Sequence, residues 1–304
     1  MPLPKRAPKP TPTFAMNLGS AAGTSIRDFY VLAHSPEYDD AFEHTNPITF
    51  ESPTSRFTHV FHYTNGRRDQ IHRVSDRLLA LWQSPSGETL SAGFPRGMFD
   101  IAPAGVSETI FKGHDGVFTG IWGSSSAHVF ACGMGPFALQ RIQGKWGPIA
   151  LPSTAAGTLH AIFGFAEEDV YFVGEKGTIL HYDGQTFVEL DVSTTRHLRH
   201  VGPLGRNLCV GGEDGVLLYG SVNGWRQVPT RTNGIIEGIA AWNGAIFFGT
   251  ADGVWRFDGS SSPTIALQRP AQRVQSLGDG LLIKLGYEAH LWDGATLAPL
   301  DTIL

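Results

Sequence analysis

Polar residues at one recurring position are the part of this sequence best suited to chemistry. Five short segments share a pattern in which the first residue is apolar and the second is polar. The polar residues are Thr119, His160, Arg199, Glu237 and Gln275. An imidazole and a carboxylate held together can exchange protons with a substrate, and a nearby guanidinium can bind an anionic group. We expect these residues to form a ring near one mouth of a central channel. The lining of a water-filled channel would have the same composition, so ligand binding, catalysis and a merely solvated lining all stay open.

A second set of mostly polar residues occupies tight turns further along each repeat. The set comprises Arg96, Glu175, Lys176, Glu213, Asp214, Asp252, Tyr287 and Glu288. Acidic residues dominate it, and an acidic surface attracts a basic partner over long range. Charged turns also keep a protein soluble, so this composition has a second, purely structural explanation.

The familiar catalytic motifs are absent. The sequence contains no GxSxG, HExxH, GxxxxGK[ST] or CxxC pattern, so we expect no cofactor and no bound metal. Among the early histidines, His59 and His62 would point to opposite faces of a strand, which disfavours a shared metal ion. The run TTRHLRH, residues 194–200, is either a small basic patch or a solvated loop.

These residues belong to a repeat with a period of 35 to 40 residues. Turn glycines mark the period at Gly105, Gly144, Gly184, Gly224, Gly259 and Gly294. Within residues 158–196, the runs LHAIFG, DVYFVG, GTILHYDG and TFVELDV are four short strands separated by polar or glycine-containing turns. Four strands per period predict one blade of a β-propeller.

The blades predicted on this register are about 77–116, 117–157, 158–196, 197–234, 235–271 and 272–304. A seventh, from about 28 to 76, would use DFYVLAHS, PITFE, THVFHYTNG and DQIHRV as its strands, although it matches the repeat poorly. The prediction is therefore seven four-stranded blades, with six blades plus an N-terminal extension as the alternative. Closure without a shared strand and closure by an added N-terminal segment both remain possible.

The repeat resembles the tandem repeats of bacterial propeller proteins of the type WGSSxxDVWAVGxxGTILHYDGxxW. IWGSSSAHVFACG (121–133) and GTILHYDGQTF (177–187) carry the resemblance, which covers residues 117–259 well. The architecture is similar to Kelch and sialidase-type propellers, but no S-x-D-x-G-x-T-W run is present. The resemblance therefore implies a fold and no particular activity.

Aromatic residues recur in the strands. We expect six of them to fill the space between blades: Trp122, Phe163, Phe172, Tyr182, Phe248 and Trp292. Trp146, Phe187 and Trp225 recur at the start of the outer strand. They are partial candidates for sugar-stacking platforms, with packing between blades as the simpler role.

Composition limits the class of protein. The 304 residues carry a formal net charge of −5, which does not suit a duplex nucleic-acid binder, and no apolar run is long enough to span a membrane. Cys132 and Cys209 lie in apolar strands, as buried thiols would. We expect residues 1–13 to be a flexible Pro-rich tail without a secretory signal, residues 14–304 to form one domain, and the location to be cytoplasmic.

Three functions follow as hypotheses. The first is a non-enzymatic protein-binding propeller, such as an adaptor or a toxin-neutralising immunity protein, for which a basic partner would suit the acidic charge. The second is a hydrolase or lyase at the channel mouth that uses His160, Arg199 and Glu237. The third is a carbohydrate-binding propeller, and the oligomeric state is left open.

Overall fold

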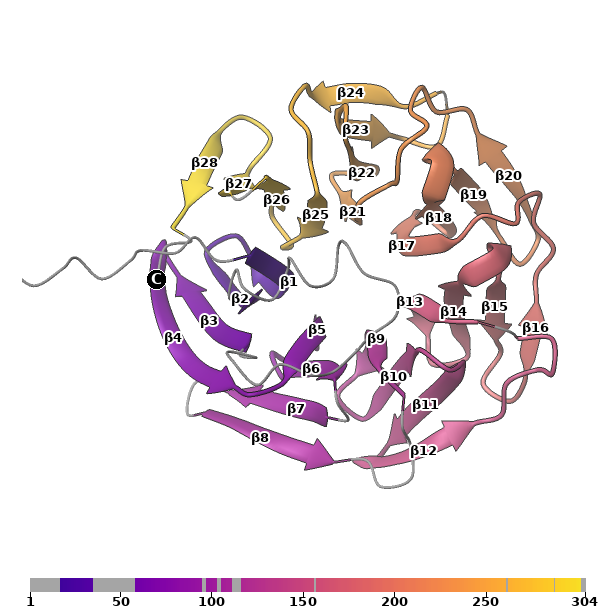
Figure 1. The fold of residues 1–304 in the computed structure, drawn as a ribbon, viewed down its shortest axis with the longest axis horizontal. Coiled ribbons are helices and arrows are strands. Elements are labelled where there is room, and N and C mark those ends of the chain that lie inside the picture. Colours follow the sequence, from indigo (N-terminus) through magenta and orange to yellow (C-terminus); the bar gives the residue numbers. More distant parts are fainter. Residues whose placement is uncertain are drawn as a thin grey trace, which may run out of the picture.

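Seven antiparallel sheets surround a central axis in the computed structural model (Figure 1). The structure describes residues 17–34, 58–94, 97–102, 105–110, 116–155, 157–260, 262–286 and 288–301. Each sheet is one blade with four strands in sequence order, and the strand nearest the axis comes first. The predicted seven-bladed propeller is therefore confirmed. The tail 1–13, PITFE, Arg96 and Tyr287 lie outside the described residues.

The strands of blades 1 to 4 are as follows. Blade 1 has β1 (Asn17–Ser25), β2 (Asp28–His34), β3 (Thr58–Thr64) and β4 (Arg67–Val74); blade 2 has β5 (Arg77–Gln83), β6 (Thr89–Phe94), β7 (Gly97–Ala102) and β8 (Gly105–Ile110). Blade 3 has β9 (Phe118–Ser125), β10 (His128–Gly133), β11 (Phe137–Ile142) and β12 (Lys145–Ile149); blade 4 has β13 (Leu159–Ala166), β14 (Asp169–Gly174), β15 (Ile179–Tyr182) and β16 (Phe187–Glu189).

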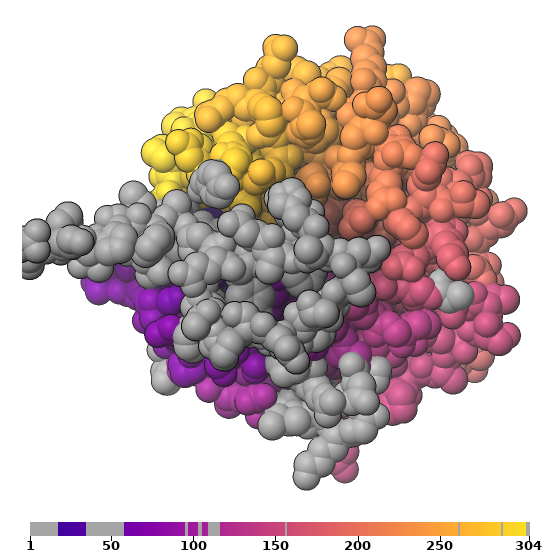
Figure 2. Space-filling view, viewed as in Figure 1, coloured from indigo at the N-terminus to yellow at the C-terminus, as the bar shows by residue number. Residues whose placement is uncertain are grey.

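Blades 5 to 7 complete the disc, whose colours run from indigo round to yellow in Figure 2. Blade 5 has β17 (Leu198–Leu204), β18 (Asn207–Gly212), β19 (Leu217–Ser221) and β20 (Gly224–Val228); blade 6 has β21 (Ile239–Trp242), β22 (Ala245–Thr250), β23 (Gly253–Phe257) and β24 (Thr264–Leu267). Blade 7 has β25 (Arg273–Ser276), β26 (Leu281–Leu285), β27 (Glu288–Trp292) and β28 (Leu297–Leu300). Two one-turn 3-10 helices, η2 (Glu175–Gly177) and η3 (Glu213–Gly215), follow β14 and β18. No described helix is long and apolar enough to cross a bilayer.

The core consists of apolar layers between blades. The described residues form seven buried clusters, and each combines side chains from two neighbouring blades. In one of them, Phe130 of blade 3 contacts Tyr182 of blade 4, with ring centroids 5.8 Å apart. The six aromatic residues expected between blades all pack in or against these clusters. Cys132 and Cys209 are free and buried, as expected.

Blade 1 begins earlier than the sequence predicted. Its innermost strand is β1, and the predicted start at residue 28 is the start of β2. The sequence NLGSAAGTS lacks the large apolar residues that mark the other inner strands, so it was missed. Close packing explains the small residues, because a Cβ on Gly23 would lie 2.3 Å from the Cβ of Phe29.

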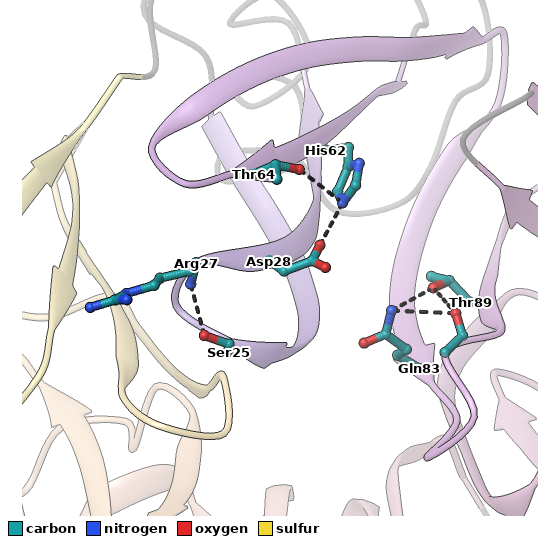
Figure 3. Close-up of polar contacts among 8 residues, drawn as sticks. Ser25, Arg27, Asp28, His62, Thr64, Gln83 and Thr89 are labelled. Carbon is teal, nitrogen blue, oxygen red and sulfur yellow. Dashed lines mark hydrogen bonds and ion pairs between the residues drawn. The ribbon is translucent and has the colours of Figure 1, made fainter.

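A repeated polar clamp shows that blade 1 is a true copy of the repeat. In blade 1, the imidazole Nε2 of His62 lies 2.6 Å from Asp28 Oδ1 (Figure 3). The His62 ring also stacks on Tyr30. In blade 4, His181 bonds Asp169 at 2.8 Å and packs on Tyr171 in the same register. The clamp joins the second and third strands of blades 1 and 4, so these two histidines have a structural role.

The ring closes between blade 7 and blade 1 without a shared strand. The backbone N–H of Ala21 donates to Gln275 Oε1 at 3.0 Å, and Arg273 Nη1 donates to the carbonyl of Gly19 at 2.6 Å. At the outer edge, the Tyr63 hydroxyl donates to the carbonyl of Asp301 at 2.7 Å. Figure 1 accordingly shows the yellow C-terminal blade beside indigo blade 1. Closure rests on side-chain bonds and one apolar cluster.

This seam makes a prediction about Gly278, in the β25–β26 turn. Its φ is +72°, and an added Cβ would lie 1.9 Å from the carbonyl oxygen of Thr24 in blade 1. Gly278→Ala should therefore lower the free energy of unfolding by about 3 kcal/mol or more, because it adds a clash to the left-handed backbone. Urea unfolding followed by tryptophan fluorescence measures this.

The matched control is Gly205→Ala in the β17–β18 turn. Gly205 has a similar φ of +65°, but a Cβ there would meet nothing within 4 Å. Only the backbone cost of about 1–2 kcal/mol should remain. Equal losses for the two variants would show that the seam is not tight at Gly278.

Candidate functional site

Three of the polar positions identified in the sequence coincide with bulges in the inner strands. The pairing of β9, β13 and β17 with their neighbours skips a residue near the start of each strand: Thr119, His160 and Arg199. A bulge leaves that residue out of the ladder and redirects its side chain. The same irregularity falls at Leu79 of β5, so the structural position recurs even where the residue is apolar.

Two members of the set hold blades together. The hydroxyl of Thr119 donates to the carbonyl of Leu159 in the next blade at 2.5 Å. Gln275 makes the bond to Ala21 that closes the ring. Strand register also shows that Gln272, whose N–H donates to Lys284 O, occupies the place in blade 7 that Glu237 occupies in blade 6. Gln275 lies three residues further along the strand.

His160 and Arg199 instead lie beside the turns that follow the second strands. Arg199 Nη2 contacts Glu213 Oε1 at 2.5 Å within blade 5. In blade 4 the corresponding residues are His160 and Glu175, and the carboxylate of Glu175 contributes to the electrostatic environment of His160. The two sets that the sequence suggested separately, at the channel mouth and in the turns, therefore meet on one face of the disc.

Two turns of the same backbone geometry position these charges. Lys176 in η2 and Asp214 in η3 adopt left-handed φ values of 57° and 53°. Each is followed by a glycine that lies close to the loop leading to the next blade. A Cβ on Gly177 would lie 2.0 Å from the carbonyl oxygen of Thr194, and a Cβ on Gly215 would lie 2.0 Å from the carbonyl oxygen of Thr232. The close approach fixes both turns against those loops.

Further contacts join blades 4 and 5 on this face. Arg196 Nε lies 2.9 Å from Asp214 Oδ2, and the backbone N–H of Lys176 donates to His197 Nδ1 at 3.2 Å. We call His160, Glu175, His197, Arg199 and Glu213 the mouth cluster. Its members are all partly exposed, so a partner can reach them.

Burial and neighbouring charges set the protonation of the mouth cluster. Burial lowers the pKa of His160, and the charge of Arg199 lowers it further against the opposing effect of Glu175. Burial raises the pKa of Glu213, but the hydrogen bond and charge of Arg199 outweigh it, and the net shift is downward. At neutral pH the cluster therefore presents a neutral imidazole beside an ionised carboxylate.

His200 lies deeper along the same strand. Burial lowers its pKa to about 3, and the charges of Arg273, Arg199 and His160 add to the shift. Arg273 interacts with the carboxylate of Glu237, which connects that predicted residue to blade 7. Of the three residues proposed for catalysis, the structure thus places His160 with Arg199, while Glu237 interacts with Arg273.

The predicted acidic turn set is largely charge-paired. Glu213 and Asp214 contact arginines, and Glu288 lies 3.7 Å from both Arg269 and His290. Asp252 is exposed in its turn and makes none of the ion pairs seen among the described residues. Arg196 and Arg269 of the interblade loops, together with Arg199 of β17, neutralise much of the expected negative surface, which the turn sequences alone do not show.

The chemistry available here is polar recognition and proton transfer. No group of three His, Cys, Asp or Glu side chains within the described residues has metal-binding geometry. Both thiols are buried, which raises their pKa to about 12 and leaves no thiolate nucleophile. Trp146, Phe187 and Trp225 are partly buried and pack on core clusters, so they do not form open stacking platforms.

Comparison with known proteins supports the fold. No protein-family model and no curated sequence matches the chain. Similar solved structures include a streptogramin B lyase (12% identity, 92% of this chain and 94% of that one, TM-score 0.72) and the WD40 repeats of RRP9 (11%, 89% and 88%, 0.67). YCF48 bound to D1 peptide is also similar (13%, 74% and 81%, 0.61). At these identities the likeness shows the propeller fold alone.

Sequence reasoning missed His197 as a partner of the Lys176 turn. It also did not connect Glu175 and Glu213 with the channel mouth. A signal was present, because the runs GEKGT (174–178) and GEDGV (212–216) have the same pattern at the same point of two successive repeats. The similar spacing, 15 residues from His160 to Glu175 and 14 from Arg199 to Glu213, would have suggested a common location.

The low pKa of His200 predicts how stability depends on pH. Between pH 6.5 and about 3 the unfolded chain binds a proton at this residue that the folded chain does not, so stability falls as the pH drops through this range. His200→Gln removes that titration. Its loss of unfolding free energy between pH 7 and pH 5 should be about 1–2 kcal/mol smaller than that of the wild type.

Urea unfolding at the two pH values gives this difference. His34, whose pKa burial lowers to about 4, supplies a residual slope in both proteins. The control is His72→Gln on exposed β4, which should follow the wild type. Parallel stability curves for His200→Gln and the wild type would contradict a neutral His200 in the folded chain.

Proposed function

We propose that this chain is a protein-binding propeller and that the mouth cluster is its principal contact surface. The observation that carries the proposal is the pair of matching turns that fix charged residues of blades 4 and 5 against the interblade loops. A surface ordered before binding loses little conformational entropy on association. Charges in fixed positions also give specificity to a protein interface.

The finer form of the proposal is a cytoplasmic adaptor or toxin-neutralising protein with a basic partner. The net charge of −5 supports it. Arg199 of the mouth cluster and Arg196 beside it pair with Glu213 and Asp214, which limits how much attraction this face supplies. The structure described as YCF48 bound to D1 peptide shares the fold, which makes peptide binding compatible with this architecture.

The test compares partner recovery by variants of the full chain. Tagged wild type is used as bait alongside a His160→Ala, Lys176→Asn double variant, in which asparagine suits the left-handed backbone at position 176. A partner that uses the mouth cluster should be recovered at least about tenfold less well by the double variant. Quantitative mass spectrometry measures recovery, and circular dichroism confirms folding.

The control is Arg67→Ala on β4, whose exposed guanidinium pairs with Asp69 at 3.0 Å far from the mouth cluster. It should recover the partner as the wild type does. If nothing is enriched over the tag alone, or if the double variant recovers the partner fully, the mouth cluster is not the contact surface.

A lyase or hydrolase remains the second candidate because His160 is a neutral imidazole flanked by Glu175 and Glu213. Such a group can accept a proton. The streptogramin B lyase of similar fold supplies a compound to try. Turnover of streptogramin B that His160→Ala abolishes would favour this function, and no turnover with or without divalent cations would remove the support for that reaction.

A further inference from the structure

An open cleft of about 670 Å³ lies between the inner-strand turns of blades 5, 6 and 7. Its walls include Pro203, Leu204 and Trp242. The charged residues that line it are Asp279 and Asp293. These turns follow the inner strands, whereas the mouth cluster lies where inner strands begin, so the cleft opens on the opposite face of the disc.

Asp293 carries a charge that no cationic side chain of the described residues pairs with. Its Oδ1 accepts the backbone N–H groups of Ala295 and Thr296, which lowers the pKa and keeps the carboxylate ionised. Within the part of the chain that the structure describes, no ion pair involves Asp293. Its Oδ2 is therefore available to a donor from another molecule.

Blade 6 contains the same turn with its charge neutralised. Asp258 follows β23 as Asp293 follows β27, and Arg256 Nη1 lies 3.3 Å from its Oδ2. At the place of Arg256, blade 7 has Leu291. The difference leaves one turn with an intramolecular arginine partner and the other without.

Hydrogen bonds and ring packing hold the rest of the cleft. Asp279 accepts the backbone N–H of Ile26 at 2.7 Å and the hydroxyl of Ser25 at 3.0 Å, which anchors its turn across the seam. The indole of Trp242 packs against Trp292, with ring centroids 6.0 Å apart. A Cβ on Gly294 would lie 2.7 Å from that indole, so the ring fits closely against the Asp293 turn.

We propose that this cleft binds an arginine side chain on an extended segment of a partner protein. The guanidinium stacks on the face of Trp242 and donates to Asp293, while Asp279 adds a second negative charge. Arginine fits better than lysine because its planar group can stack on an aromatic ring and donate in parallel to a carboxylate. The volume exceeds that of one side chain and leaves room for neighbouring residues against Pro203 and Leu204.

Arg27 lies in the neighbouring β1–β2 turn, and Arg206 lies in the β17–β18 turn that forms one wall; neither is among the residues that line the cleft. Figure 3 shows Arg27 extending from the β1–β2 turn towards the ribbon of blade 7. A short probe with a single positive charge therefore suits the test better than a highly basic peptide, which these arginines would repel.

The test is a titration of the full chain with N-acetyl-Gly-Arg-Gly-amide, followed by 1H–15N NMR. Shifts should concentrate at the Trp242 indole N–H and the backbone N–H groups of Gly244 and Gly278, with a Kd of about 1 mM. The matching citrulline peptide, which has the same shape without the charge, should bind at least about tenfold more weakly.

Two variants complete the design. Asp293→Asn should weaken the arginine peptide about tenfold, and the matched Asp258→Asn in blade 6 should leave its affinity unchanged. Shifts that are absent or elsewhere, citrulline or lysine peptides that bind equally well, or equal effects of the two variants would overturn the proposal. The titration needs no cellular partner, so its outcome is independent of the mouth-cluster test.

Discussion

Apolar contact between neighbouring blades is the interaction on which the rest of this structure depends. A twisted four-stranded sheet exposes two apolar faces and can cover neither by itself. Among the described residues, each cluster of buried side chains combines residues of two adjacent blades. A blade therefore buries its apolar side chains only when its neighbours are folded beside it. The two proposed binding surfaces follow from this arrangement, because each face of the disc consists of turns that connect the packed strands.

The blade interfaces also explain why so many polar groups near the axis are unavailable to ligands. Thr119 and Gln275 look equivalent to His160 in the sequence, yet their side chains bond the neighbouring blade. Inner strands of adjacent blades are too close for every polar side chain to face the channel. What distinguishes His160 and Arg199 is an acidic turn within reach, supplied by Glu175 and Glu213.

The repeat made most of the fold predictable. Blades 2 to 7 carry enough aromatic and β-branched residues, at regular intervals, to reveal their strands and turns. Blade 1 was found only in part, since β1 is built from small residues that the tight packing against Phe29 demands and that periodicity does not detect. Four of the five residues of the mouth cluster were predicted individually, but His197 and the assembly of the five were not. Side-chain pairing between a turn and a loop, such as Arg196 with Asp214, depends on distances that repeat spacing does not encode.

Closure by side chains at the seam has a consequence for synthesis on the ribosome. Blade 1 emerges first, and the side of it that holds Phe29 and Phe61 is covered by Leu277 and Leu282 of the last blade. That side stays exposed to solvent until nearly the whole chain has been made. Every partly synthesised molecule therefore carries an apolar surface that promotes aggregation. Such an incomplete propeller depends on rapid completion of synthesis or on a chaperone that covers the exposed side of blade 1.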